Sequence, residues 1–418
     1  MKTDGFRELR LTEYKPLRLA RGELTDPEAE SIWRAGGNRI RVEAPKPWSG
    51  NCWELVSEGW VGYIPAGRSL GLVLEPKLPL ANLFRMLEYA YKLESFQLLH
   101  GDMEASSLKD FYERLANVLA KRVLDRTRKG LYASYLVHVE QLPFVRGTLD
   151  LRERLKRPWA TRIACRYQEH TADLEDNQIL TWTLGRIAQS GLCSDRVLPV
   201  VRRAFHSLHG AARNLPFSPR DCAGRLYNRL NCDYEPLHAL CRFFLEHAGP
   251  THEVGDRKMI PFVVNMARLY ELFVAEWLKQ HLPPGLELKY QETFKFGADD
   301  AFAFAMDMVL YDTRTGRPLS VLDAKYKVPD KPGAEDIAQV LAYAGAKGCA
   351  EAALVYPRQP DRPLDAVVGG KRVRSLVFGL SDDLHLAGSA FLDSLSRLVA
   401  EAGASHTARA DRDPSQGI

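Results

Sequence analysis

The chain of 418 residues has the length of two or three ordinary domains. Its hydrophobic share of 45% and charged share of 26% are globular values, which exclude collagen, a coiled-coil rod and disorder for most of the chain. The net charge of +4 is weak, but it divides unevenly, with 23 basic and 17 acidic groups in residues 101–250 against 18 and 21 in residues 251–402.

The first hundred residues predict a β-rich domain. The first residues lack the apolar core of a secretory signal, and no run in the chain reaches the ~18 apolar residues of a membrane span, so we expect a cytoplasmic protein without membrane contact. Short β patterns separated by turns predict strands within 9–19, 39–43, 53–56 and 70–74. Thr25-Asp26-Pro27 predicts a helix start, and apolar residues four apart predict a helix after Pro79.

Residues 101–250 predict a mainly helical region. Helical spacing predicts a helix from Ser107 that ends in basic residues before Gly130, and further helices over 173–191 and 233–247. The basic clusters at 121–129 and 152–157 could follow a DNA backbone, dock an acidic partner or be solvated helix faces. The seven cysteines contain no Cys-x-x-Cys pair, so we expect buried free thiols.

From Pro261 the pattern changes to an α/β unit of nuclease size. A helical stripe runs from Met266 to Trp277. Strands are predicted over 286–296, 306–311, 319–326 and 352–356, with a helix over 336–346. The tail 403–418 has almost no apolar residues and is expected to be disordered. The expected fold class is α/β overall and multidomain, with domains at 1–100, 101–250 and 251–402.

Two carboxylates fall inside apolar strand patterns, where an acid is costly unless a cation neutralises it. Asp307 lies between Met306 and Met308, and Asp323 follows Val321-Leu322. The two strands are joined through a turn, so the carboxylates could face one another and hold Mg²⁺ through oxygen ligands. Because side chains alternate along a strand, Lys325 shares a face with Asp323 and would lie beside the metal.

The surroundings of this motif distinguish it from chance. The pattern (Asp/Glu)-x-Lys occurs five times, at Glu13/Lys15, Glu75/Lys77, Asp256/Lys258, Glu287/Lys289 and Asp323/Lys325. Only the last follows an acid in an apolar strand and precedes a helix carrying Gln339 and Tyr343. Those two side chains share a helix face and could contact a DNA phosphate or orient the lysine. The alternative is a solvated hairpin with an ordinary amphipathic helix.

This arrangement resembles the PD-(D/E)xK nuclease superfamily, with Met306-Asp307 standing where the family has Pro-Asp. Members often add an acid on the helix before the first strand, and Glu271 matches that position, although a surface glutamate would look the same. The resemblance implies a restriction-endonuclease-like α/β domain over 251–402 that hydrolyses phosphodiesters with Mg²⁺. The expected catalytic residues are Asp307, Asp323, Lys325, Glu271, Gln339 and Tyr343, and the expected metal ligands are Asp307, Asp323 and the carbonyl of Ala324.

Over a longer stretch the chain resembles McrC, the nuclease subunit of McrBC-type modification-dependent (type IV) restriction systems. The resemblance runs from about residue 61 to 360 and rests on motifs in a fixed order: Val61-Gly62-Tyr63-Ile64, Leu74-Glu75-Pro76-Lys77-Leu78, Asn82 to Leu87, Arg146 to Asp150, Asp173 to Asn177, the helix with Glu271, and Leu322 to Lys327. It implies that double-stranded DNA with modified cytosine is cleaved only in complex with a McrB-like hexameric AAA+ GTPase. The N-terminal domain would insert into that ring and stimulate GTP hydrolysis.

The chain agrees with this division of labour, because it has no Gly-x-x-x-x-Gly-Lys-(Ser/Thr) loop and GTP would be bound only by the partner. We therefore expect a metal-dependent endodeoxyribonuclease. Two other functions stay open, a non-catalytic adaptor that activates an AAA+ NTPase and holds DNA, and a standalone PD-(D/E)xK nuclease. The intact Asp307, Asp323 and Lys325 favour a nuclease over an adaptor.

Overall fold

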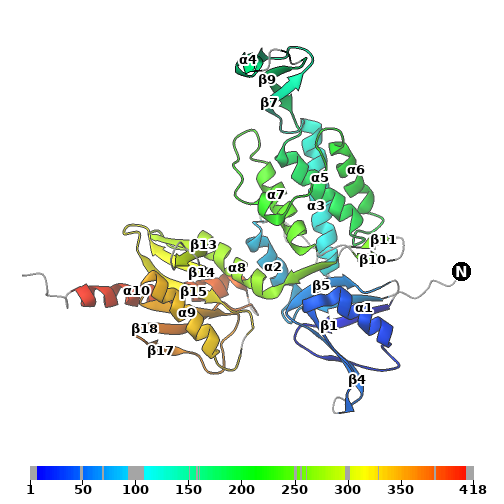
Figure 1. Ribbon diagram of the computed structural model, residues 1–418. Helices are drawn as coiled ribbons and strands as arrows, with labels where there is room; N and C mark the ends of the chain where they lie inside the picture. The colour runs from blue at the N-terminus through cyan, green and yellow to red at the C-terminus, as the bar shows by residue number, and fades with distance from the viewer. Residues whose placement is uncertain are drawn as a thin grey trace, which may run out of the picture.

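Two sheets and one helix form the N-terminal part of the molecule (Figure 1). The computed structural model describes residues 7–47, 50–67, 70–92, 108–149, 151–156, 159, 161–248, 252–254, 257–259, 261–296, 302–327, 329–380 and 383–410. The larger sheet consists, in spatial order, of β1 (Arg7–Thr12), β6 (Leu70–Glu75), β5 (Trp60–Pro65) and β12 (Phe262–Asn265). The smaller sheet consists of β2 (Leu17–Ala20), β4 (Cys52–Ser57) and β3 (Ile40–Glu43).

Helix α1 (Asp26–Gly36) packs between these sheets and is followed by the short 3₁₀ helix η1 (Gly37–Arg39). It begins with the predicted Pro27 and a capping box, in which the Glu28 carboxylate accepts the backbone N–H of Thr25 at 2.9 Å. Ile32 carries the apolar face of α1 into a core shared with both sheets. The helix start predicted at Thr25 is therefore confirmed.

The larger sheet takes its last strand from far along the chain. β12 pairs antiparallel with β5, with Val263 opposite Gly62. Gly62 has a φ of +142°, and a Cβ there would lie 2.1 Å from the carbonyl oxygen of Phe262, so only glycine permits this approach. β12 leads directly into α8 (Met266–His281), and the backbone N–H of Met266 donates to the carbonyl of Gly59 at 3.0 Å. The N-terminal sheet thus anchors the helix that opens the C-terminal part.

A helical body occupies the middle of the chain. Its helices are α2 (Leu80–Ala90), α3 (Leu108–Lys129), α5 (Glu175–Gln189), α6 (Leu198–Leu208) and α7 (Tyr234–His247), with the 3₁₀ helix η4 (Pro219–Cys222) before α7. The ring centroids of Phe84 and Phe111 lie 4.3 Å apart, and this stacked pair joins α2 to α3. The hairpin β10 (His252–Val254) and β11 (Arg257–Met259) follows the body.

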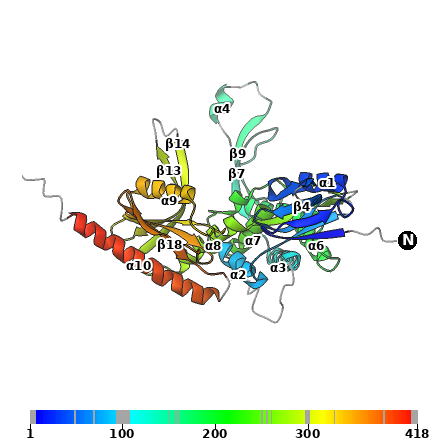
Figure 2. The same ribbon diagram turned by 90° about the horizontal axis from the view of Figure 1, so that it is seen from below.

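An arm projects from this body, as Figures 1 and 2 show. It consists of β7 (Ser134–Leu142), β8 (Thr148–Leu149), β9 (Ile163–Thr171) and the short helix α4 (Leu151–Lys156). Large apolar side chains are exposed along it, and the exposed fractions of Tyr135, Val139 and Trp159 are 66%, 66% and 79%. The arm is therefore an apolar surface that the rest of the described chain does not cover.

The C-terminal part is a six-stranded sheet between helical layers. In spatial order its strands are β13 (Leu286–Phe296), β14 (Phe302–Asp312), β15 (Pro318–Ala324), β16 (Glu351–Tyr356), β18 (Lys371–Val377) and β17 (Asp365–Val368). Helix α9 (Ala334–Lys347) packs on one face through Val340 against Val309 and Val321. The opposite face packs on α8 and on α10 (Leu384–Ala410), which runs along the sheet in Figure 2.

Many predicted elements are confirmed, and several real ones were not predicted. β13 has the predicted bounds, whereas β5, α6, β17, β18 and α10 were not predicted. α10 reaches Ala410, inside the tail expected to be disordered, and residues 411–418 lie outside the described residues. Four cysteines are buried as expected, but Cys232 is exposed. None of the helices among the described residues has the length and apolar character that a membrane crossing requires.

Candidate active site

The sheet register brings the two strand carboxylates together. β14 and β15 pair antiparallel, and Met308 lies opposite Leu322, so the next positions along the strands set Asp307 opposite Asp323. Asp323 shares its face of the sheet with Val321, which packs on α9. The buried apolar neighbours explain why both strands form here and why both acids lose water. The facing pair suggested by the sequence is therefore present in the fold.

The carboxylate of Asp323 is buried, and its oxygens lack hydrogen-bond partners among the described residues. Its side chain is 1% exposed, and Oδ2 lies 2.9 Å from Nζ of Lys325. The distance is that of an ion pair, but neither oxygen of Asp323 accepts a well-oriented hydrogen bond from any described residue. An ammonium close to one oxygen leaves most of the hydrogen-bonding capacity of the two buried oxygens unused. The carboxylate thus keeps lone pairs free for a cation.

Like charges surround Asp307. Burial and the nearby carboxylates of Glu271 and Asp323 raise the pKa of Asp307 to about 8, and Lys325 offsets only part of this. Burial also raises the pKa of Glu271, against hydrogen bonds to Tyr290 and Gln291 that lower it. Three acids therefore share one weakly solvated region, where Lys325 acts on Asp307 and Arg268 on Glu271. A cation bound there would remove the repulsion between them.

The lysine is held by three groups. Its Nζ lies 2.9 Å from Asp323 and 3.3 Å from Asp336, and it donates to Oε1 of Gln339 at 3.2 Å. Burial lowers the pKa of Lys325, but the two carboxylates outweigh burial and the net shift is upward. The ammonium is therefore charged and fixed in direction at neutral pH.

Gln339 and Tyr343 share one face of α9, as their spacing predicts. Nε2 of Gln339 donates to the hydroxyl of Tyr343 at 2.8 Å, which turns Oε1 of Gln339 toward the lysine. The ring of Tyr343 is buried and stacks on Phe304 at 5.0 Å. Of the two roles left open from the sequence, the contacts support orientation of Lys325.

Two polar residues of this site were not predicted. Gln291 lies opposite Asp307, where the otherwise continuous pairing of β13 with β14 is interrupted, and its φ is +50°. Its Nε2 donates to Oε1 of Glu271 at 3.5 Å, a long contact. Asp336 stands in the first turn of α9. An acid in the first turn after an Asp-x-Lys strand could have indicated Asp336, whereas the sequence carries no signal for the backbone of Gln291.

The donor set fits a hard divalent cation, though incompletely. Among the described residues, no three carboxylates, imidazoles or thiolates are close enough to form a ready metal cluster. Asp323 nevertheless presents two buried oxygens without hydrogen-bond partners, the half-buried Asp307 lies opposite it, and the carbonyl of Ala324 is the next oxygen along the chain. Two carboxylates and a carbonyl suit Mg²⁺, which commonly completes its shell with water and substrate phosphate.

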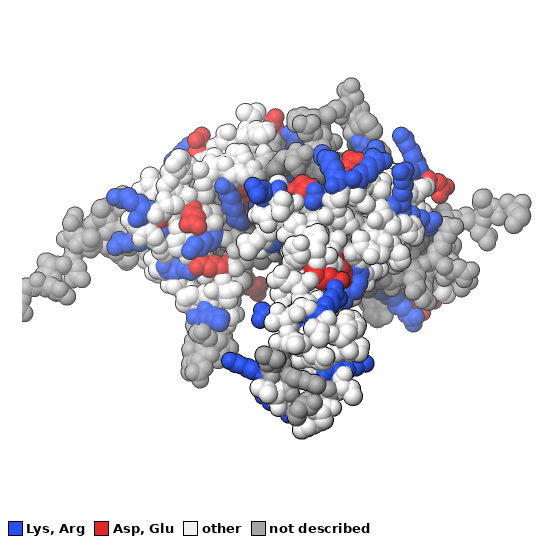
Figure 3. Space-filling view, turned by 90° about the horizontal axis from the view of Figure 1, so that it is seen from above, with Lys and Arg blue, Asp and Glu red and all other residues white. Residues whose placement is uncertain are grey.

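The two basic clusters of the middle region differ in their surroundings. In the first, Arg126 lies 3.4 Å from Asp233 and Arg128 lies 3.3 Å from Asp125, so part of its charge is neutralised. In the second, Arg152 and Lys156 are exposed on the arm, and Arg157 lies outside the described residues. Figure 3 shows basic side chains spread over many elements with acids between them, so no single basic face dominates that view.

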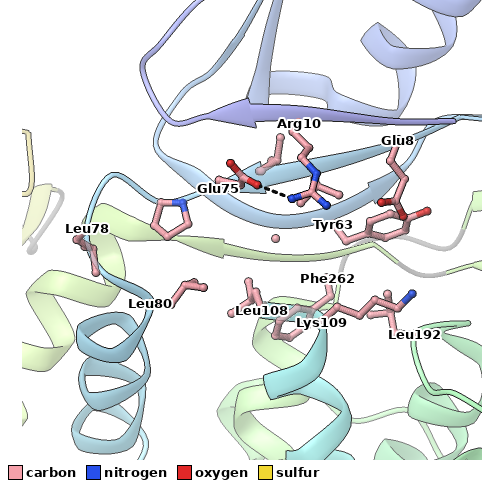
Figure 4. Close-up of a pocket in the computed structure, with 14 residues that line it drawn as sticks. Glu8, Arg10, Tyr63, Glu75, Leu78, Leu80, Leu108, Lys109, Leu192 and Phe262 are labelled. Atoms are coloured by element: carbon pink, nitrogen blue, oxygen red, sulfur yellow. Dashed lines mark hydrogen bonds and ion pairs between the residues drawn. The ribbon is translucent and has the colours of Figure 1, made fainter. Parts of the chain in front are cut away.

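A cavity of about 390 Å³ lies between the N-terminal sheet and the helical body (Figure 4). Apolar residues including Leu78, Leu80 and Phe262 line it, and Arg10 and Glu75 pair on its sheet side at 3.2 Å. None of the predicted site residues borders it. The cavity therefore lies apart from the facing carboxylates on the C-terminal sheet.

Fold and site together define a multidomain α/β protein with two facing aspartates on adjoining strands and an oriented lysine beside them. Residues 55–357 match the family described as McrBC 5-methylcytosine restriction system component, and the chain belongs to this family. The family resemblance inferred from the sequence is thereby confirmed.

Two relatives illustrate the match. The chain is 21% identical over 213 residues to the type IV methyl-directed restriction enzyme EcoKMcrBC of Escherichia coli K12, covering 50% of this chain and 61% of that enzyme. The chain thus spans less than two thirds of that relative. A solved assembly of Thermococcus gammatolerans McrB AAA+ hexamers with bound McrC contains a chain that matches with a TM-score of 0.53 and 15% identity. That match covers 94% of this chain and 100% of the other, and it shows likeness of fold.

Proposed function

We propose that this protein is a Mg²⁺-dependent DNA endonuclease, the nuclease subunit of a McrBC-like restriction complex. The facing pair of the half-buried Asp307 and the buried Asp323, with Lys325 two residues further along, carries the proposal. The helix, antiparallel strands, helix and parallel strand around them agree with the PD-(D/E)xK domain expected from the sequence. A domain that had lost its nuclease activity would have no reason to keep two acids that repel each other in apolar strands.

The mechanism that follows is hydrolysis of a phosphodiester. When bound, Mg²⁺ would be held by Asp307, Asp323 and the Ala324 carbonyl, and would polarise the phosphate and acidify a water. Lys325 donates from Nζ to the attacking water or to a phosphate oxygen and stabilises the charge that develops there. Gln339 and Asp336 fix this ammonium, and Glu271 reaches the site through a water.

We assign the partner and substrate by family. The related assembly places McrC with McrB AAA+ hexamers, and we propose the same type of ring for this chain, with GTP bound only by the ring. The substrate would be double-stranded DNA with modified cytosine. Residues 1–100 would dock to the ring, and the exposed apolar arm offers a second contact surface to it.

The test is plasmid cleavage by the full chain with its AAA+ partner, nucleotide and Mg²⁺. Asp323→Asn should lower the cleavage rate by at least about 100-fold, because it removes charge without changing size. Asp312→Asn at the far end of β14 is the matched control and should cut normally. Equal cutting by Asp323→Asn would disprove the site, and cleavage by the wild type without partner or nucleotide would indicate a standalone nuclease.

A further inference from the structure

A cleft of about 400 Å³ opens beside the catalytic strand, between the N-terminal and C-terminal parts. One wall carries Tyr14 and Lys77, and the other carries Tyr326, Lys327 and Arg358. Tyr326 and Lys327 directly follow the catalytic lysine in sequence, and Arg358 follows the neighbouring strand β16. The cleft therefore begins one residue past Lys325 in the chain, although none of the candidate site residues lines it.

Cations converge on this cleft. Nζ of Lys77 lies 4.4 Å and Nζ of Lys327 lies 5.5 Å from the centroid of the same Tyr14 ring. Neither lysine nor Arg358 has a carboxylate within 4 Å in the part of the chain that the structure describes. Gathered like charges repel each other unless an anion lies between them.

A buried acid, Glu13, lies behind the cleft. Its carboxylate is fully buried behind the walls, where Oε1 accepts the backbone N–H of Lys77 at 2.9 Å and the hydroxyl of Tyr326. It thus joins the two walls. Lys77, Lys327 and Arg358 have no ion-pair partner among the described residues, so three unpaired cations remain in the cleft in either state of Glu13.

The backbone of Tyr14 also indicates a functional cleft. Tyr14 has a φ of +58°, which costs a non-glycine residue ~1 kcal/mol or more. This conformation presents the ring on which both ammonium groups lie. Strain of this kind persists where surrounding contacts require it, and it is enriched in ligand sites.

We propose that this cleft binds a phosphodiester group of the DNA strand next to the scissile bond. Lysine and arginine at its mouth recognise phosphate oxygens, and Lys327 lies two residues after Lys325 in the chain. This inference rests on the proposed nuclease function for its choice of DNA. A free nucleotide has the same phosphate chemistry, and the experiment separates the two sources.

The experiment measures binding of a fluorescent DNA duplex to the full chain in EDTA, so that nothing is cleaved. The test variants are Lys327→Gln, Arg358→Gln and the double variant Lys77→Gln/Lys327→Gln. All three side chains are exposed, so the variants should fold, which melting curves verify. Each lost phosphate contact should weaken binding several-fold and reduce the slope of log K against log salt by ~0.9.

Matched controls make the result specific. Arg34→Gln removes one exposed charge from α1, far from the cleft along the chain, and should leave the slope unchanged. Lys327→Arg keeps the charge and should keep the affinity. Wild-type affinity and slope in the cleft variants would overturn the inference. It would also be overturned if a mononucleotide, and not the duplex, loses binding in those variants.

The proposed function can fail separately. If Asp323→Asn cuts DNA normally while the cleft variants lose duplex binding, the nuclease site is wrong and the phosphate cleft stands. If Asp323→Asn abolishes cleavage while the cleft variants bind like the wild type, the nuclease site stands and the phosphate cleft is wrong.

Discussion

The hydroxyl of Tyr326 donates a hydrogen bond to the buried carboxylate of Glu13, which lies 313 residues earlier in the chain. Tyr326 directly follows Lys325, and Glu13 directly follows strand β1 of the N-terminal sheet. Glu13 also holds the backbone of Lys77. One acid therefore connects the N-terminal sheet to the segment that directly follows Lys325.

Tyr326→Phe tests this connection. Loss of the hydroxyl leaves a buried carboxylate with one donor fewer, which should cost ~1–3 kcal/mol of unfolding free energy and lower the cleavage rate. Tyr356→Phe is the matched control, because the buried Tyr356 hydroxyl has no hydrogen-bond partner among the described residues. Chemical denaturation and plasmid cleavage measure both effects. Equal stability of the two variants would show that the Glu13 contact contributes nothing.

Gln291 should act on the site through its side-chain amide and on stability through its backbone. Gln291→Ala and Gln291→Gly both remove the amide that contacts Glu271, so both should reduce cleavage to a similar degree. Glycine also relieves the φ of +50°, so Gln291→Gly should be ~1 kcal/mol more stable than Gln291→Ala. If the cleavage rates of the two variants differ in the same order as their stabilities, the side-chain amide of Gln291 has no positioning role.

Gly62→Ala should separate β12 from β5. The new methyl would meet the Phe262 carbonyl oxygen at 2.1 Å, in addition to the strain of a positive φ, and we expect a loss above ~2 kcal/mol. Gly130→Ala is the control, because Gly130 has a φ of +98° but no atom within 4 Å of a new Cβ. It should cost only ~1 kcal/mol. Similar melting temperatures for the two variants would contradict the close approach.

His247 should make the protein sensitive to acid. Burial, with the charges of Arg268 and Arg242, lowers the pKa of His247 to about 3, against its hydrogen bond to the Val263 carbonyl at 3.2 Å. As the pH falls below 6.5, the ordinary pKa of histidine, the imidazole of His247 therefore binds a proton in the unfolded chain but not in the folded chain. This stability is complete above that pH and falls toward pH 3, by up to ~1.4 kcal/mol per unit.

Unfolding titrations at several pH values measure this effect. Between pH 6.5 and 4, the advantage of the wild type over His247→Gln should shrink, because the variant has no imidazole to protonate on unfolding. Parallel pH profiles for the two proteins would show that His247 does not contribute.

The sequence predicted the parts of the site that depend on local spacing. Strand alternation placed Asp323 and Lys325 on one face, and helical spacing placed Gln339 beside Tyr343. Contacts between distant segments were beyond it, because nothing near Glu13 indicates Tyr326. Among the elements, β13 was predicted because its residues alternate, whereas α6 was missed because Pro199 and the pair Arg202-Arg203 disguise its apolar stripe.

Strand β12 also sets an order of events during synthesis. Residues 262–265 leave the ribosome on the order of ten to forty seconds after β6, at roughly 5–20 residues per second. Until then β5 is an open edge whose backbone groups can pair with another chain. The N-terminal sheet is therefore completed only when α8 begins to emerge, so the nascent protein must protect that edge for nearly half of its translation.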